Sequence, residues 1–192
     1  MERQESLQLI EAMINKARNQ FTENGHLYLL WGWVVLVCSV VHFTLLNFTT
    51  FQKPWLVWLL TWLAVAYQVR YIFRRNKQQR VRTYTDDILK YVWICFTICM
   101  FLLSYVIGAM MGGDAFRYFY PVFLVLYGVP TFLSGIILRF RPLVAGAIGC
   151  WALSLPAALI PFRYQLLLLA AAVLVAWIIP GYMLRARFKQ QQ

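Results

Sequence analysis

Negative charge is scarce in this sequence, which has 7 Asp and Glu against 18 Lys and Arg among its 192 residues. The acidic residues either precede the first long apolar run or lie between apolar runs: they are Glu2, Glu5, Glu11, Glu23, Asp86, Asp87 and Asp114. A proton relay or an acid–base pair within a membrane helix needs an ionisable partner such as a carboxylate inside the apolar segment. The sequence therefore excludes a carboxylate-based site of this kind.

Motifs for catalysis and cofactor binding are also missing. The chain has no P-loop, no Rossmann glycine run and no H-E-x-x-H zinc motif. Serines that fall within apolar runs have no carboxylate there to complete a hydrolytic triad: they are Ser39, Ser104, Ser134 and Ser154. Nor do apolar and polar residues alternate as in the strands of a membrane β-barrel. We therefore predict a helical protein that is not an enzyme and binds no cofactor.

Apolar residues make up 61% of the chain, and its mean hydropathy is +0.61. They gather in runs close to the roughly 17 to 25 residues with which a helix crosses about 30 Å of hydrocarbon. The runs are Leu27–Phe48, Pro54–Phe73, Ile88–Met111, Tyr118–Leu138, Pro142–Ile160 and Tyr164–Leu184. We predict an all-α polytopic membrane protein. Its six-transmembrane-helix bundle would occupy residues 26–185, between a cytoplasmic amphipathic helix at 1–25 and a basic cytoplasmic tail at 186–192.

The distribution of basic residues predicts the orientation. With the N-terminus in the cytoplasm, only Lys53, Arg117 and Arg163 of the 18 basic residues face outward. Cytoplasmic loops are enriched in Lys and Arg, so both termini are predicted to be cytoplasmic. The basic loop after the second run lies directly beneath a span, where we expect contact with anionic lipid rather than nucleic acid. Its basic residues are Arg74, Arg75, Lys77, Arg80 and Arg82.

Residues 5–21, ESLQLIEAMINKARNQF, have the pattern of an amphipathic helix. Apolar residues recur at steps of three and four and form one apolar stripe: Leu7, Ile10, Ile14, Ala17 and Phe21. Helices that bind a membrane surface through charge are rich in Lys and Arg, but residues 1–23 contain 3 basic and 4 acidic side chains. We therefore expect the apolar stripe to dock on protein. The candidates are the cytoplasmic ends of its own spans, a second copy in a homo-oligomer, or a cytosolic partner.

Few side chains within the runs are candidates for chemistry. His42 is the leading intramembrane polar site, because an ionisable group in hydrocarbon is costly and often functional; its expected role is a hydrogen bond to a neighbouring span. Cys95 and Cys99 lie four residues apart on one helix face, a spacing that allows soft-metal binding or thiol exchange. For Cys95 and Cys99 we favour a packing role, as we do for Cys38 and Cys150.

The apolar runs also contain features that predict their shape. Pro130, Pro156 and Pro180 each free a backbone carbonyl and should kink a helix. The segment Ala145–Gly149, AGAIG, places small residues four apart and favours close helix packing within the monomer. The two halves of the chain show a faint similarity, which would suit an inverted repeat of the kind found in transporters.

Two parts of the chain resemble a known group of proteins. They are ESLQLIEAMINKARNQF with the YLLWGWVVL that follows, and PTFLSGIILRFRPLVAGAIGCW at Pro130–Trp151. Together they resemble a family of small uncharacterised bacterial inner-membrane proteins that carry an amphipathic N-terminal helix before several spans. The resemblance implies the architecture and a bacterial plasma membrane, and it brings no activity or functional residue with it.

Three classes of function remain open. The favoured class is a non-enzymatic membrane protein that recruits or regulates a cytosolic partner through the N-terminal helix. The second is a small transporter or permeation subunit, which six spans and three proline sites suggest, although no buried charge marks a substrate path. The third is a membrane thiol redox enzyme that uses Cys95 and Cys99.

Overall fold

The computed structural model describes residues 25–49, 52–78 and 84–190, and within them every regular element is a helix. The all-α class is confirmed. Helical stretches that are long and apolar enough to cross a membrane number five in these residues: His26–Phe48, Pro54–Arg74, Thr85–Ile137, Arg141–Leu159 and Phe162–Lys189. The predicted N-terminal helix lies outside the described residues, as do Arg80 and Arg82 of the basic loop.

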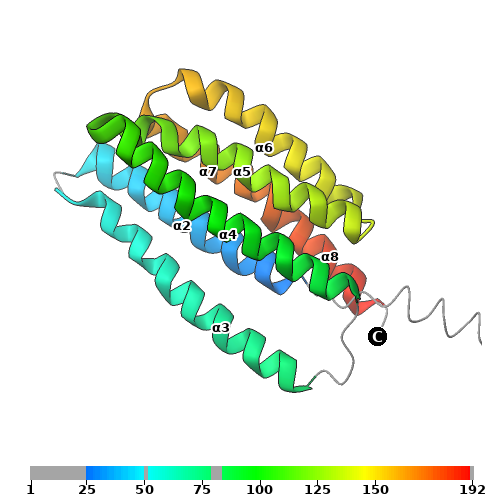
Figure 1. Cartoon of the computed structure of the whole chain (residues 1–192). Coiled ribbons are helices and arrows are strands. Elements are labelled where there is room, and N and C mark those ends of the chain that lie inside the picture. Colours follow the sequence, from blue (N-terminus) through cyan, green and yellow to red (C-terminus); the bar gives the residue numbers. More distant parts are fainter. Residues whose placement is uncertain (1–24, 50–51, 79–83, 191–192) are drawn as a thin grey trace, which may run out of the picture.

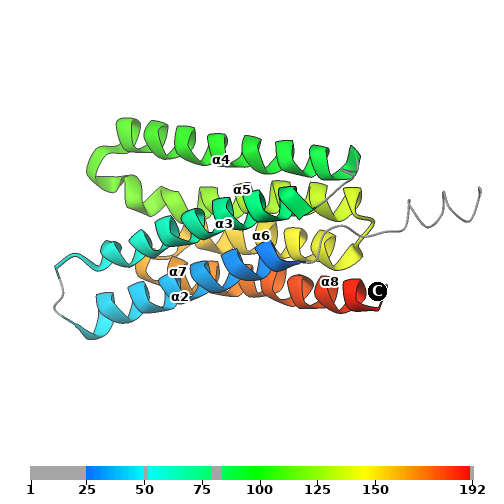
Figure 2. The same cartoon turned by 90° about the horizontal axis from the view of Figure 1, so that it is seen from below.

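The helices run back and forth through an elongated bundle (Figures 1 and 2). The main elements are α2 (His26–Phe48), α3 (Leu60–Gln78), α4 (Tyr84–Met111), α5 (Ala115–Ile137), α6 (Arg141–Leu159), α7 (Phe162–Val173) and α8 (Ile179–Lys189). A short helix of the 3-10 type, η1 (Pro54–Leu59), leads into α3, and another, η2 (Gly112–Asp114), joins α4 to α5. A π-helical turn, η3 (Leu174–Ile178), joins α7 to α8 in one continuous stretch.

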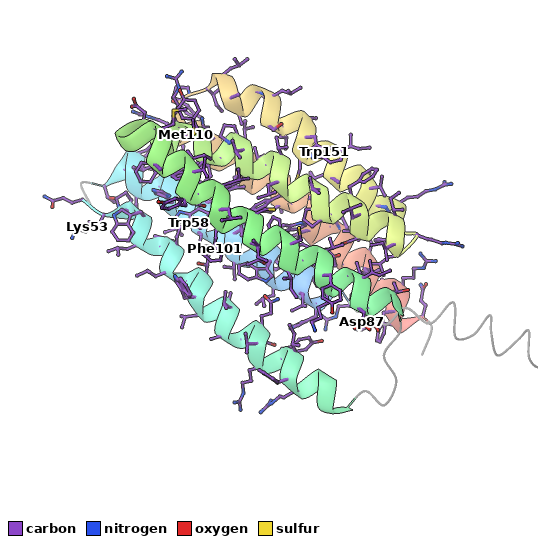
Figure 3. The ribbon with its side chains drawn as sticks, in the orientation of Figure 1. Lys53, Trp58, Asp87, Phe101, Met110 and Trp151 are labelled. Atoms are coloured by element: carbon purple, nitrogen blue, oxygen red, sulfur yellow. The ribbon has the colours of Figure 1, made fainter. Side chains whose placement is uncertain are left out.

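The bundle has two ends of different character. Lys53 lies at one end and Asp87 at the other (Figure 3). We name the second of these the basic end, because α3, α5 and α8 finish there beside Arg74, Arg139 and Arg185. Helices α2, α4 and α6 begin at the basic end, so the described residues 25 and 190 both lie there.

The turn between α5 and α6 shows how local sequence reverses the chain. Arg139 has a φ of 49°, in the left-handed region that favours glycine. The N–H of Phe140 donates to the carbonyl of Gly135 at 2.8 Å, and that of Arg139 to the carbonyl of Ile136 at 3.1 Å. These are the two bonds of a Schellman motif, which satisfies the last carbonyls of α5. Pro142 then occupies the first turn of α6, where its missing N–H costs no helical hydrogen bond.

The centre of the bundle is the stretch from α7 through η3 to α8, which packs against α2, α5 and α6. Glycines in the neighbouring helices allow a close approach. A Cβ at Gly146 of α6 would lie 2.6 Å from Cα of Ala176, and one at Gly32 of α2 would lie 2.7 Å from Cγ1 of Ile178. The small-residue segment of α6 therefore packs within the monomer, and Gly146 is the residue that makes the contact.

Of the three prolines expected to kink helices, Pro180 coincides with a change in hydrogen-bond pattern. The ring of a proline clashes with the carbonyl four residues earlier, here that of Ala176. The π-helical turn η3 contains Ala176 and ends two residues before Pro180, so the extra residue in its turn makes room for the ring. Helices α5 and α6 continue through Pro130 and Pro156 as single elements.

Helices α3 and α4 lie at the periphery. Among the described elements α3 packs only on α2 and η1, and it stands apart from α4 in Figure 1. Helix α4 packs beside α5, and its Trp93 ring contacts those of Tyr28 and Trp177. The third long helix of the first half, α4, is thus peripheral, whereas its counterpart in the second half, the stretch from α7 to α8, fills the centre. The two halves of the chain therefore differ in how deeply their third helix is buried.

Candidate functional site

The structure describes only some of the residues that the sequence predicted to form functional sites. The apolar stripe of residues 7–21 lies outside the described residues. Arg74 is exposed near the end of α3, and Arg75 and Lys77 belong to the last turns of the same helix. His42 lies on α2 and the pair Cys95 and Cys99 on α4, so the structure keeps these two candidate sites on separate elements.

His42 forms the centre of a polar and aromatic cluster toward the Lys53 end of the bundle. Its side chain is 4% exposed, and its Nδ1 accepts a hydrogen bond from Nε1 of Trp58 at 3.0 Å. The ring of Phe162 lies 6.0 Å from the imidazole, centroid to centroid. The ring of Tyr120 packs against both Trp58 and Phe162. The cluster therefore unites α2, η1, α5 and α7.

This geometry gives His42 a structural task. A ring nitrogen that accepts a hydrogen bond carries no proton, so the imidazole is neutral in this arrangement. Trp58 lies in η1, where the chain turns into α3 (Figure 3), and the bond therefore ties the start of the α3 stretch to α2. The sequence predicted a hydrogen bond between His42 and a neighbouring span, and in the structure Trp58 is the donor.

Gln165 of α7 is a buried polar residue that the sequence analysis missed. Its side chain is 0% exposed. The two N–H groups of its Nε2 are shared among three backbone carbonyls, those of Arg117 at 3.1 Å, Ala157 at 3.0 Å and Ile160 at 3.2 Å. One amide group thus joins the first turns of α5, the end of α6 and the start of α7.

A proline inside α5 and the end of α6 explain why these carbonyls need a side-chain donor. Arg117 precedes Pro121 by four residues within α5, and a proline has no N–H to offer a helical carbonyl. Ala157 belongs to the last turn of α6, which ends at Leu159, and the last carbonyls of a helix have no helical donor. Gln165 supplies the donor that Pro121 and the end of α6 lack. The signal available in the sequence was a glutamine four residues after Pro161 in an otherwise apolar run.

A second polar link lies midway along the bundle. Nε1 of Trp177 in η3 donates to Oγ1 of Thr131 in α5 at 2.9 Å, and that hydroxyl donates to the carbonyl of Tyr127 at 2.7 Å. The buried polar side chains of the described residues are Ser39, His42, Thr131, Ser134, Ser154 and Gln165. None of them is charged. His42, Thr131 and Gln165 form hydrogen bonds between different elements, and these bonds hold the helices together.

The cysteines form no disulfide, but Cys95 and Cys99 share a side-chain hydrogen bond. All 4 are free, with Cys38 and Cys150 buried, Cys95 exposed and Cys99 half-buried on the peripheral helix α4. In the part of the chain that the structure describes, no group of three His, Cys, Asp or Glu side chains is placed to hold a metal ion.

A groove of about 330 Å³ opens at the basic end between α2, α3 and α8. Its lining combines a cation, an imidazole and two phenols with apolar side chains: His26, Leu29, Leu30, Trp33, Val34, Tyr67, Tyr182 and Arg185. Side-chain hydrogen bonds connect its walls. Nε2 of His26 and the hydroxyl of Tyr67 lie 3.1 Å apart, and Nε1 of Trp33 donates to the hydroxyl of Tyr182 at 3.3 Å. We name this feature the basic-end groove.

Comparisons of the chain with models of protein families, with curated proteins and with solved structures found no match.

Proposed function

We propose that the protein is a six-span membrane scaffold whose N-terminal amphipathic helix recruits or regulates a cytosolic partner. The observation that carries this proposal is the position of Gly25, which links residues 1–24 to α2. Gly25 has a φ of 69°, and a Cβ there would lie 2.5 Å from the carbonyl oxygen of Gly181 in α8. The chain therefore enters α2 at a point fixed against α8, at the basic end of the bundle.

The count of six spans depends on the long stretch Thr85–Ile137. A straight helix of its 53 residues would extend about 80 Å at 1.5 Å per residue, against about 30 Å of hydrocarbon. The chain turns back at η2, and α4 packs beside α5, which supports two crossings. Basic residues concentrate at the basic end, so we assign that end and both termini to the cytoplasm. The assignment to a bacterial plasma membrane rests on the resemblance of the sequence.

The interior of the bundle favours a scaffold over a transporter. The centre is filled by α7, η3 and α8, whose side chains include Leu166, Val173 and Ala176 at 0% exposure. His42, Thr131 and Gln165 form hydrogen bonds between elements. A substrate path would have to break these contacts, whereas a scaffold is stabilised by them.

The test compares two double variants with the same added charge. Ile10→Asp with Ile14→Asp places two carboxylates in the apolar stripe, and Gln8→Asp with Asn15→Asp places two on the opposite face of the helix. A photo-crosslinking amino acid at Ala17 first identifies the partner by mass spectrometry. The distribution of that named partner between membrane and cytosol is then measured in cells that express each variant.

We expect the stripe variant to insert normally and to release the partner into the cytosol, while the opposite-face variant keeps the partner at the membrane. A partner that stays on the membrane in both variants would contradict recruitment by the stripe. Crosslinks that form only to residues of the same chain would show that the helix packs on its own spans.

A further inference from the structure

The basic-end groove joins a cationic rim to an apolar floor. Arg185 and the hydroxyls of Tyr67 and Tyr182 provide the polar side, and Leu30 and Val34 continue along α2 as an apolar surface. None of the described residues that line the groove is acidic. The groove therefore suits an amphiphile that has a negative head and an apolar tail.

Helix α3 adds positive charge beside the groove. Arg70, Tyr71 and Arg74 lie three, four and seven residues after Tyr67, so the four residues share one face of α3. The hydroxyl of Tyr67 lies 3.1 Å from Nε2 of His26, and the ring of Tyr71 lies 4.7 Å from the imidazole, so this face is turned toward α2. Arg70 and Arg74 are exposed, and they place two further guanidinium groups at the basic end.

The aromatic side chains place the groove at a membrane boundary. Trp33, Tyr67 and Tyr182 are 45%, 47% and 49% exposed, so each presents about half of its surface outside the bundle. Aromatic rings that carry one polar atom favour the headgroup layer. Arginine side chains near the end of a span extend their guanidinium groups to the same layer. The groove therefore faces the lipid headgroups of the leaflet at the basic end.

We propose that the basic-end groove binds one anionic phospholipid, with the phosphate beside Arg185 and an acyl chain along Leu30 and Val34. A guanidinium group can hold a phosphate through two parallel hydrogen bonds, and Arg70 and Arg74 add attraction for the headgroup. A free phosphate would leave the apolar floor uncovered. The inference uses the membrane orientation of the proposed function and is independent of any cytosolic partner.

Native mass spectrometry of the full-length chain in detergent micelles tests the site. The probes are phosphatidylglycerol and phosphatidylcholine with identical acyl chains. We expect the chain to retain one phosphatidylglycerol in preference to phosphatidylcholine. Removing one arginine near the headgroup should lower that preference about fivefold, so we expect this loss in Arg185→Gln. The matched control is Arg187→Gln on the same helix, because Arg187 lies over the ring of Phe140 at 6.0 Å instead.

A second variant tests the apolar floor without a change of charge. Leu30→Trp should fill the groove and reduce retention of both lipids, while circular dichroism confirms that the bundle remains folded. Equal retention of the two lipids by the unaltered chain would overturn the proposal, as would an equal loss in Arg187→Gln. Retention of inorganic phosphate in lipid-free micelles, lost in Arg185→Gln, would assign the groove to a soluble anion. Greater lipid retention by a chain that lacks residues 2–20 would assign the groove to the N-terminal segment.

Discussion

Replacement of Gln165 by leucine removes the one described side chain that donates to carbonyls of both α5 and α6. Leucine fills a similar volume and offers no donor, and it also removes the buried Oε1, which has no hydrogen-bond partner among the described residues. The variant loses two N–H donors that the carbonyls of Arg117, Ala157 and Ile160 share. Two of these carbonyls have no helical donor to return to: Pro121 stands where α5 would supply one to Arg117, and Ala157 lies in the last turn of α6.

The size of the effect follows from these contacts. Hydrogen bonds within membrane proteins average about 0.6 kcal/mol each, which gives about 1 kcal/mol for the two N–H donors. A buried carbonyl left without a donor costs about 1 to 3 kcal/mol, which gives up to about 6 kcal/mol for two. The site lies close to the Lys53 end of the bundle, where water can reach a disturbed helix end. We therefore expect Gln165→Leu to lower the free energy of unfolding by about 2 to 4 kcal/mol.

Pro121→Ala provides a rescue that depends on the mechanism. An alanine at this position in α5 has an N–H that can donate to the carbonyl of Arg117. In the Gln165→Leu background it should restore about 1 kcal/mol, relative to its effect in the unaltered chain. Effects of proline on the unfolded chain are the same in both backgrounds and cancel in the double-mutant cycle.

The assay is unfolding by titration with sodium dodecyl sulfate in mixed micelles, followed by the helical circular dichroism signal. All four proteins of the cycle are measured under the same conditions. A free energy for Gln165→Leu within about 0.5 kcal/mol of the unaltered chain would refute the role of the amide, since ordinary surface changes fall within that range. An identical effect of Pro121→Ala in both backgrounds would refute the link to the proline-freed carbonyl.

The same titration checks substitutions at four other positions. His42→Gln keeps a hydrogen-bond acceptor and should cost about 1 kcal/mol or less with insertion unchanged; a variant that folds normally but loses a membrane activity would reveal a functional histidine. Gly146→Ala should cost at least about 2 kcal/mol, because its Cβ would lie 2.6 Å from a backbone atom of η3, whereas Gly149→Ala meets only a side chain at 3.3 Å and should cost under about 1 kcal/mol. Equal costs would contradict the close crossing of α6 and η3. Arg139→Gly relieves a φ of 49° and should stabilise the protein by about 0.5 to 1 kcal/mol, so a loss of stability would argue against strain in that turn.

The positions of the helices could be predicted from the sequence because hydropathy is a local property. The first apolar run, Leu27–Phe48, differs from α2 by one residue at its start, and the fifth, Pro142–Ile160, differs from α6 by one at each end. Turn residues mark these limits without reference to the rest of the chain. Which helix fills the centre depends instead on contacts between distant segments. The close fit of Gly32 and Gly146 against η3 places α7 and α8 there, and the run of apolar residues alone does not distinguish them from α3.

The candidate site was predictable only in part, for the same reason. His42 is conspicuous as the ionisable group in an apolar run, but its partner Trp58 is set by the turn that brings η1 against α2. Gln165 bonds to a carbonyl 48 residues away in sequence, and that carbonyl becomes an acceptor only because Pro121 follows it. The apolar stripe of residues 7–21 lies outside the described residues and remains a prediction.

The central claim is that the basic end of the bundle, with the N-terminal helix, faces the cytoplasm. Single cysteines at Asn76, Gly113 and Gln190, in a chain whose 4 native cysteines are replaced, test it directly. Cells with a permeabilised outer membrane and an intact inner membrane are treated with a membrane-impermeant maleimide. The account predicts that the cysteine at Gly113 reacts, whereas those at Asn76 and Gln190 react only after the inner membrane is disrupted. Labelling at Asn76 in intact cells would place the basic end outside and would contradict recruitment of a cytosolic partner.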